Sequence, residues 1–460
     1  MSALENILGM LPDRVGEGKN SQIYTPPHIA EEMVNALPDD IWNKDTTFFD
    51  ICCKSGIFLY YIYMKLMESP SMIADFPNET DRATHIVHKQ LFGIAPNTFC
   101  KMFSTRTVYG YLEPDSHIIS LGDNYNHVMQ NPDRRFLLET LKKEFGTMKF
   151  DVVIGNPPYN RGMDLDFVNL GFERSNKYVC MITPAKWQTA EGEQKIASKT
   201  TNYKWFRDKL VPHISTVVFY PDSYDLFAIS QADGITYYVI DKQCEVDKCH
   251  VVNKCYIQPY INSEVDRNIK NGETLWNIGQ EILDYLGDYC KFQFLPTDNS
   301  KLYKVNINKQ MALGGMGYRV QEMGEDGHWH LKKDIVGKGG PLFSQDGNLY
   351  ALGKTSILKN NQEATSGTSL DIFWTDSIEE CKSFYSYINS KFVRFLLLIN
   401  TVGLSGISNK ETWKYVPAPD LKEDGDYDWS KIYTDEYLYE KFNLPQKYID
   451  IIEAVIKERK

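Results

Sequence analysis

Four consecutive residues, Asn156-Pro-Pro-Tyr159, carry side chains and carbonyls that could act on a planar, amine-bearing ring. The Asn156 amide supplies both a donor and an acceptor, and the proline carbonyls are acceptors without neighbouring ladder bonds. The Tyr159 ring offers a face for stacking, and we expect it to be exposed. Together these groups suit a planar base that carries an exocyclic amine.

The residues before this tetrapeptide predict where it lies. Val152, Val153 and Ile154 are consecutive, apolar and β-branched, which is typical of a central parallel strand. Gly155 and the two prolines then end the strand. Ligands of open α/β sheets bind at the carboxyl ends of the strands. A plain turn after a strand is the alternative, because Asn-Pro and Pro-Pro are common in loops.

Three upstream segments could hold a second ligand. Residues 46–52 form an apolar strand pattern that ends near Asp50, and Ser55 and Gly56 come before a helix pattern. A strand, a short turn and a helix N-terminus are a frequent entry to a cofactor site. Tyr24 and Thr25 precede two prolines and an amphipathic pattern, so we expect Thr25 to cap a helix there. Asp123 follows a third strand pattern.

The order of patterns predicts an α/β fold with a parallel sheet covered by helices on both faces. After about residue 245 the alternation stops, and a mixture of short strands, glycines and aromatic residues predicts a second domain. One long helix is expected there, over 377–398. The expected strands are 46–52, 91–95, 116–121, 150–155, 178–182, 215–220 and 234–240; the expected helices of the first half are 57–67, 80–89, 97–109, 133–145 and 203–210.

Length and composition indicate a two-domain globular protein. The chain has 460 residues, of which 42% are hydrophobic and 24% charged. We expect a cytoplasmic protein, because we find neither a secretion signal nor a membrane-spanning run, and the nine cysteines are scattered. The net charge of −11 argues against general polyanion binding but allows a local basic cleft. Basic residues concentrate in 186–209, 301–309 and 319–338.

No metal site is expected. Cys244, Cys249, His250 and Cys255 form the one cluster with metal-binding residue types, but their spacings are not those of zinc sites. We interpret the cluster as part of a strand edge.

The first half of the chain resembles the gamma-class N6-adenine DNA methyltransferases, closest to the methylases of restriction–modification systems. Four segments match in family order: residues 24–30, which begin Tyr-Thr-Pro-Pro; residues 50–58, Asp-Ile-Cys-Cys-Lys-Ser-Gly-Ile-Phe; Gly122-Asp123; and Asn156–Tyr159. Two departures stand out. Lys54 replaces the first glycine of the cofactor motif, and residues 91–96 lack the acid that holds the cofactor ribose in the family.

The resemblance implies a Rossmann-like S-adenosylmethionine-dependent methyltransferase domain over 1–245 and a mixed α+β DNA target-recognition domain over 246–460. It implies a monomer acting on double-stranded DNA, with any restriction endonuclease a separate partner. Asn156 and Pro157 would accept the two hydrogens of adenine N6, and Tyr159 would stack on the flipped base, with Phe227 on its opposite face. The implied cofactor residues are Tyr24, Thr25, Asp50, Ser55, Gly56, Ile94, Asp123 and Asn156.

Three alternatives stay open at this point. A protein-glutamine methyltransferase also uses Asn-Pro-Pro-Tyr, although it should lack the Thr-Pro-Pro segment and so long a second half. An RNA adenine methyltransferase would differ only in its substrate. A binding protein without cofactor belongs to another class, suggested by Lys54 and the missing ribose acid. For Phe227, a residue that plugs the end of the sheet is as good an interpretation as a stacking one.

Overall fold

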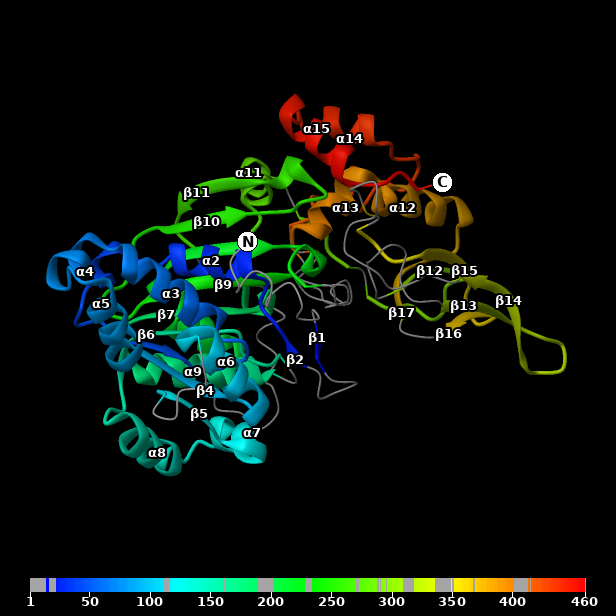
Figure 1. The fold of residues 1–460 in the computed structure, drawn as a ribbon. Helices are drawn as coiled ribbons and strands as arrows, with labels where there is room; N and C mark the ends of the chain where they lie inside the picture. Colours follow the sequence, from blue (N-terminus) through cyan, green and yellow to red (C-terminus); the bar gives the residue numbers. More distant parts are fainter. Residues whose placement is uncertain are drawn as a thin grey trace.

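A nine-stranded sheet is the largest sheet among the described residues and lies on the left of the view (Figure 1). The computed structural model describes residues 14–15, 22–110, 116–159, 162–188, 202–227, 234–269, 273–287, 289, 291–294, 296–308, 318–335, 349, 351–366, 369–400, 413 and 415–459. The strand order is β11-β10-β8-β9-β7-β6-β3-β4-β5. The strands are β3 (Phe48–Asp50), β4 (Leu91–Ala95), β5 (Ile118–Ser120), β6 (Phe150–Gly155), β7 (Ser175–Pro184), β8 (Ile214–Tyr220), β9 (Ile235–Asp241), β10 (Cys249–Asn253) and β11 (Ser263–Arg267).

Five neighbouring strands, β7, β6, β3, β4 and β5, run parallel, as predicted. Their carboxyl ends therefore meet at one edge of the sheet. The sheet as a whole is mixed, because β9 runs antiparallel between β7 and β8, and β11 runs antiparallel to β10. The segments expected at 91–95 and 150–155 have the bounds of β4 and β6.

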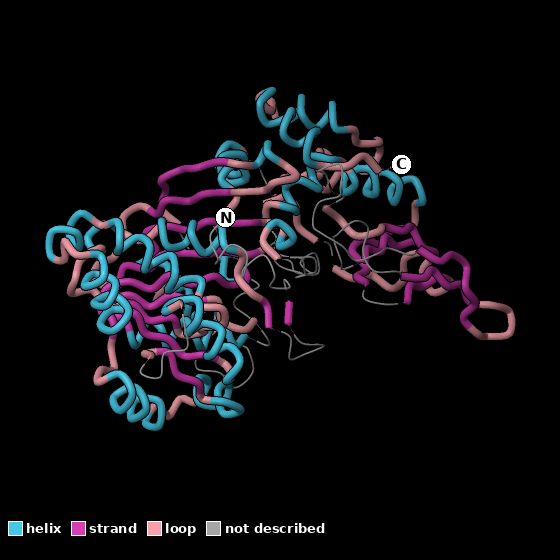
Figure 2. The backbone as a smooth tube through the Cα atoms, viewed as in Figure 1, coloured by secondary structure: helices cyan, strands magenta, loops and turns pink. Residues whose placement is uncertain are grey.

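Helices cover both faces of the sheet (Figure 2). Alternate residues of β6 explain why: Val152 and Ile154 join one core cluster, and Val153 joins the other. The first cluster includes side chains of α2 (Pro27–Asn35), α3 (Ile57–Glu68), α4 (Pro70–Asp75), α6 (Thr98–Tyr109) and the π-helical turn Ile86–Gln90 that follows α5 (Glu79–His85). The second includes α7 (Tyr125–Gln130), α8 (Arg135–Phe145), α9 (Met163–Arg174) and α10 (Tyr203–Lys209).

The large sheet extends beyond the expected change at residue 245. β10 pairs with β8, and β11 pairs with β10, so the sheet ends at Arg267. The core also continues, since one cluster joins Val153 of β6 to Trp276, which precedes α11 (Asn277–Tyr285), and to Ile452 near the end of the chain. The expectation of a break at 245 was based on the loss of βα alternation. However, β10 joins the sheet parallel to β8 and β11 joins antiparallel to β10, with no α-helix among the described residues between β9 and β10 or between β10 and β11.

Beyond α11, the described residues form two three-stranded sheets and the helices α12 to α15. They lie to the right of the large sheet in the view (Figure 1). One sheet has the order β15-β12-β17 and the other β14-β13-β16. A two-stranded sheet, β1 (Arg14–Val15) with β2 (Gln22–Ile23), lies near the start of the chain. The remaining bounds are β12 (Tyr303–Asn308), β13 (Tyr318–Met323), β14 (Trp329–Ile335), β15 (Thr355–Lys359), β16 (Glu363–Ser366), β17 (Ser369–Thr375), α12 (Ile378–Asn389), α13 (Lys391–Leu398), α14 (Asp435–Lys441) and α15 (Gln446–Val455).

The single helix expected over 377–398 is wrong, because the chain breaks at Ser390 into α12 and α13. The Ser390 hydroxyl accepts the Val393 N–H at 3.2 Å and so caps the second helix. Arg394 is 1% exposed, and its guanidinium donates to the carbonyls of Asn389 at 2.8 Å and Lys457 at 2.7 Å. The buried arginine therefore satisfies backbone acceptors around the break.

Among the described residues no helix is long and apolar enough to cross a membrane.

Candidate active site

The end of β6 lies directly beside the end of β3. Gly155 packs so closely that a Cβ there would lie 3.0 Å from Cγ2 of Ile51 and 3.6 Å from Oδ1 of Asp50. The Ile51 side chain would have to shift to admit a Cβ, so this close approach favours glycine, in addition to its role in ending the strand. The contact brings the Asn156 turn and the predicted cofactor carboxylate to one point on the sheet edge.

Asn156 is 3% exposed, and its Nδ2 donates to the Thr25 hydroxyl at 3.1 Å. This bond assigns Oδ1 to the other branch of the planar amide. The expected helix cap at Thr25 is wrong, since Pro26 occupies the N-cap position of α2 without a side-chain cap. Thr25 instead orients the side chain that the sequence singles out for chemistry.

Tyr159 is partly buried, so the expectation of an exposed ring is wrong. Its hydroxyl donates to the Ile182 carbonyl on β7 at 3.3 Å, and burial raises the pKa of Tyr159 well above its usual value. The phenol is thus neutral and fixed at the sheet edge. Pro157, between Asn156 and this ring, is buried as well.

Phe227 is 3% exposed and packs in the core cluster that contains Tyr220, Ile235 and Tyr237. Its N–H donates to the Ser223 carbonyl at 2.9 Å, which closes a turn after β8. This is the place expected of a residue that plugs the end of the sheet. Residues 228–233, which follow in the same predicted loop, lie outside the described residues.

Asp50 is a buried carboxyl at the carboxyl end of β3. It is 1% exposed, and its Oδ1 accepts the Cys52 N–H at 2.9 Å. Burial raises the pKa of Asp50 to about 7, although the Cys52 N–H and the positive charge of Lys54 both oppose this rise. Lys54, which stands where the family has glycine, is 9% exposed and thus acts on Asp50 from within the turn.

The turn between β3 and α3 is shaped by Gly56, whose φ is +77°. A Cβ at Gly56 would lie 3.0 Å from the Ser104 carbonyl oxygen of α6, so this turn also requires glycine. Ser55 beside it is buried. The N-terminus of α3 therefore starts next to Asp50, as the sequence predicts for a cofactor-binding entry.

The end of β4 carries no carboxylate, in agreement with the sequence. Ile94 is fully buried in the core, and its carbonyl accepts the Cys53 N–H at 2.9 Å. Asn97, the first polar side chain after the strand, accepts the Cys100 N–H at 2.8 Å and caps α6. Backbone pairing and helix capping thus use the groups that follow β4.

Tyr24 lies against α6. It is 7% exposed, and burial together with the Cys100 thiol raises the pKa of Tyr24. Cys100 belongs to the first turn of α6, so Tyr24 closes over the helix that follows β4. The structure thereby brings Tyr24 near the sheet edge that Thr25 and Asn156 share.

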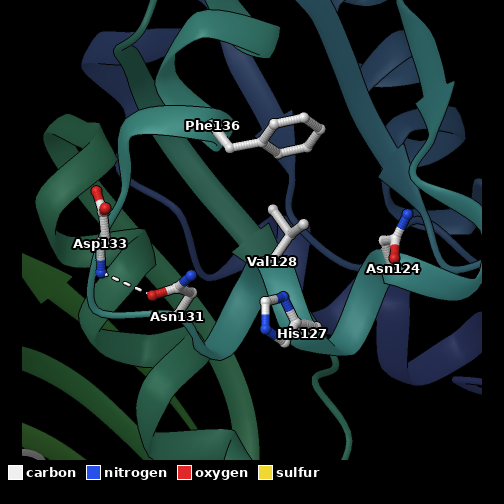
Figure 3. A pocket seen from close by; sticks show the side chains of 6 residues that line it. All are labelled: Asn124, His127, Val128, Asn131, Asp133 and Phe136. Atoms are coloured by element: carbon white, nitrogen blue, oxygen red, sulfur yellow. Dashed lines mark hydrogen bonds between the residues drawn. The ribbon is translucent and has the colours of Figure 1, made fainter.

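Asp123 is exposed in a 3₁₀ turn, Gly122–Asn124, after β5. The next residue, Tyr125, is buried, and its hydroxyl donates to the Ile51 carbonyl at 3.1 Å, which ties this turn to the Asp50 turn. A separate hollow of about 240 Å³ lies close by and is lined by Asn124, His127, Val128, Asn131, Asp133 and Phe136, whose side chains are drawn in Figure 3. None of the predicted site residues lines it.

The sequence reasoning missed the contacts that hold α2 on the sheet. Glu32 Oε1 accepts the hydroxyls of Tyr237 at 2.5 Å and Tyr220 at 3.0 Å, and its Oε2 pairs with Lys254 Nζ at 2.7 Å. Three strands or their ends thus anchor the helix that follows Thr25. Glu32 lies beyond the first turn of α2, so no local pattern predicts this network.

Among the described residues, no group of three or more His, Cys, Asp or Glu side chains is placed to hold a metal ion. Cys249 and His250 lie on β10, and the His250 ring contacts Asp266 at 2.7 Å and Glu264 at 2.9 Å on β11. The eight cysteines among the described residues are free thiols.

Parts of this chain are similar to known proteins. Residues 89–166, which include β4, β5, β6 and Asn156, match the family model described as Eco57I restriction-modification methylase. A protein of Mycoplasma pneumoniae, named an uncharacterized adenine-specific methylase, is 24% identical over 340 residues, with 58% of this chain and 77% of the relative covered.

Two solved structures are more distant. The methyltransferase subunit of a type I restriction-modification system from Streptococcus thermophilus is 14% identical, covers 54% of this chain and 50% of that one, and has a TM-score of 0.35. A nuclease-deletion mutant of the Type ISP restriction-modification enzyme LlaGI, in complex with a DNA substrate mimic, is 12% identical, covers 67% of this chain and 36% of that one, and has a TM-score of 0.42. The chain spans half or less of the length of these two proteins. Residues 89–166 are thus similar to restriction-modification methylases, and 58% of the chain is similar to a protein named an adenine-specific methylase.

Proposed function

We propose that the chain transfers a methyl group from S-adenosylmethionine to N6 of adenine in double-stranded DNA. The observation that carries this proposal is the junction of Asn156, held by Thr25, with the Asp50 turn at one edge of the sheet. It supplies an acceptor pair for an amine and a cofactor entry within the same small region. The matched family and the adenine-specific relative support the same reaction.

The residues around Asp50 fit the methionine end of the cofactor. A buried carboxyl with a raised pKa, beside a glycine turn and a helix N-terminus, can accept bonds from an ammonium or hydroxyl group. Tyr24, Thr25, Ser55 and Gly56 would complete this end of the site, and Asp123 would receive the adenine end. When bound, the cofactor supplies an electrophilic methyl group. Ile94 can offer the cofactor only apolar surroundings, because its side chain is buried in the core.

Asn156 Oδ1 and the Pro157 carbonyl would accept the two hydrogens of N6. This draws the lone pair of the nitrogen out of conjugation with the ring, toward the methyl donor, by positioning and electrostatics. The target base must first leave the helix stack, since N6 is not accessible inside a duplex. Tyr159 would form the floor of the base pocket. Phe227 remains our proposal for the opposite face, and its movement out of the core would be needed for that role.

Labelled S-adenosylmethionine tests the reaction directly. We expect label to appear at N6 of adenine in unmethylated duplex DNA and not in RNA. Transfer to RNA alone would establish the RNA methyltransferase instead. Failure to bind S-adenosylmethionine in calorimetry would leave a nucleic-acid-binding protein without enzymatic activity and refute the proposal.

Cofactor binding should depend on pH through Asp50. Because burial raises the pKa of Asp50 to about 7, the carboxyl is largely protonated below that pH and becomes an anionic acceptor for the cofactor ammonium above it. The affinity for S-adenosylmethionine should therefore rise about tenfold from about pH 6 to about pH 8, with release of up to one proton. Calorimetry in buffers of different ionisation enthalpy measures both quantities. With Asp50→Asn the cofactor itself still titrates, but the rise in affinity with pH should be absent. The same pH dependence in both proteins would contradict the assignment.

A further inference from the structure

A hollow of about 720 Å³ is lined by residues of β12, β14, β15 and α12. These elements lie far from β6 in the fold (Figure 1). Lys332 and Lys333 of β14, Lys359 of β15 and Lys382 of α12 stand around it. Tyr303 of β12 and Tyr385 of α12 also contribute to its lining. Four lysines thus surround one hollow in a chain whose net charge is −11.

The negative charges near the hollow balance only part of this positive charge. Lys332 contacts Glu363 and, at 3.4 Å, Glu322, and Lys382 contacts Glu379 at 2.9 Å. Among the residues that the structure describes, no carboxylate forms an ion pair within 4 Å of Lys333 or Lys359. Burial lowers the pKa of nearby Lys354, and the charges of Arg459 and Lys333 lower it further, so positive charge is also present beyond the hollow.

The exposure of these lysines indicates which anion they suit. The side chains of Lys332 and Lys382 are 45% and 52% exposed, so their ammonium groups remain hydrated. Small phosphate ligands are typically held by backbone N–H groups at a helix N-terminus. Long, solvated lysines on several elements instead suit a row of phosphates, to which they bind as point charges without reading sequence.

We propose that this hollow binds the phosphodiester backbone of duplex DNA at a distance from the Asn156 site. The identity of the duplex rests on the proposed function, but the binding itself needs neither cofactor nor methyl transfer. A local basic surface on an acidic protein would restrict the duplex to one face and repel it elsewhere. It would contribute affinity and orientation, while sequence selection requires contacts to base edges.

The test is duplex binding as a function of salt concentration, for the full chain without cofactor. In Lys333→Gln/Lys359→Gln we expect affinity to fall about equally for duplexes of different sequence. The slope of log K against log salt should become shallower by roughly 0.9 for each phosphate that the variant no longer neutralises. Lys333→Arg/Lys359→Arg should restore the slope. Lys142→Gln/Lys143→Gln, which removes two charges from α8 in a distant part of the molecule, should leave it unchanged (Figure 1).

The outcomes separate this proposal from the proposed function. A slope that stays the same in Lys333→Gln/Lys359→Gln, with cooperative thermal unfolding retained, would overturn the basic hollow as a DNA contact even if the chain methylates DNA. No duplex binding by the unmodified chain would overturn it too. Inhibition of duplex binding by millimolar pyrophosphate only in proteins that keep Lys333 and Lys359 would support it. Pyrophosphate binding that leaves the duplex unaffected would identify a small-anion site instead.

Discussion

Replacing Asn156 by alanine should reduce kcat for adenine methylation by about 10²–10³-fold or more, the effect typical of removing one aligned electrostatic group. The loss follows from the geometry of a 3% exposed amide whose Nδ2 is held by Thr25. Without Oδ1, one hydrogen of N6 has no acceptor while charge develops on the nitrogen. The affinity for S-adenosylmethionine should stay within about threefold, because this acceptor acts on the target amine in the transition state and not on the bound cofactor.

Asn131→Ala is a matched control for this experiment. Asn131 carries the same side chain but lies in the turn between α7 and α8, where its Oδ1 accepts the Asp133 N–H at 2.9 Å (Figure 3). Its substitution removes a turn contact and no proposed catalytic group, so activity should be retained. Transfer by Asn156→Ala at the rate of the unmodified chain would refute the role of the amide. A large loss of cofactor affinity would move Asn156 to the cofactor side of the site.

The parts of the fold that could be predicted are those with strong local signals. Residues 150–155 combine a β-branched apolar run with Gly155 and two prolines, so both the strand and its end depend on adjacent residues. The segment 91–95 is a short apolar run, and the structure gives β4 the same bounds. The turn at Gly56 belongs to this group as well, since the strand, glycine and helix follow one another directly.

The errors concern contacts that join distant segments. Thr25 and Asn156 are 131 residues apart, and no local pattern indicates that the threonine hydroxyl accepts from that amide rather than from its own helix. The hydroxyl of Tyr159 likewise finds a carbonyl on β7, which places the ring inside. The break at Ser390 depends on buried Arg394 and on the carbonyl of Lys457, 63 residues further on. Burial and long-range hydrogen bonds overrode the local propensity in each case.

The position of Thr25 is set by the helix that follows it. Glu32, further along α2, is held by Tyr220, Tyr237 and Lys254, so α2 has little freedom to slide along the sheet. Proline at the start of α2 restricts the backbone between this anchor and Thr25. The hydroxyl is therefore presented to Asn156 by a rigid element, which is what an orienting contact requires.

Thr25→Val should lower kcat by about 10–100-fold, because it leaves the buried Nδ2 of Asn156 without an acceptor at a cost of about 1–3 kcal/mol. Valine keeps the shape and the β-branch of threonine, so packing is conserved. Cofactor affinity should change little, and Thr25→Ser, which keeps the hydroxyl, should recover most of the rate. Single-turnover methylation and calorimetric titration measure the two quantities separately.

The same pair of variants decides between two roles for Thr25. If its hydroxyl acts on the methionine end of the cofactor, Thr25→Val should raise the dissociation constant of S-adenosylmethionine and leave single-turnover rates at saturation unchanged. If it orients Asn156, the rate falls at saturation, and adding Thr25→Val to Asn156→Ala causes little further loss because the partner is already absent. The 3.1 Å contact between the two side chains favours the second result. Additive losses in the double variant would show that the two residues act independently and that the contact has no part in catalysis.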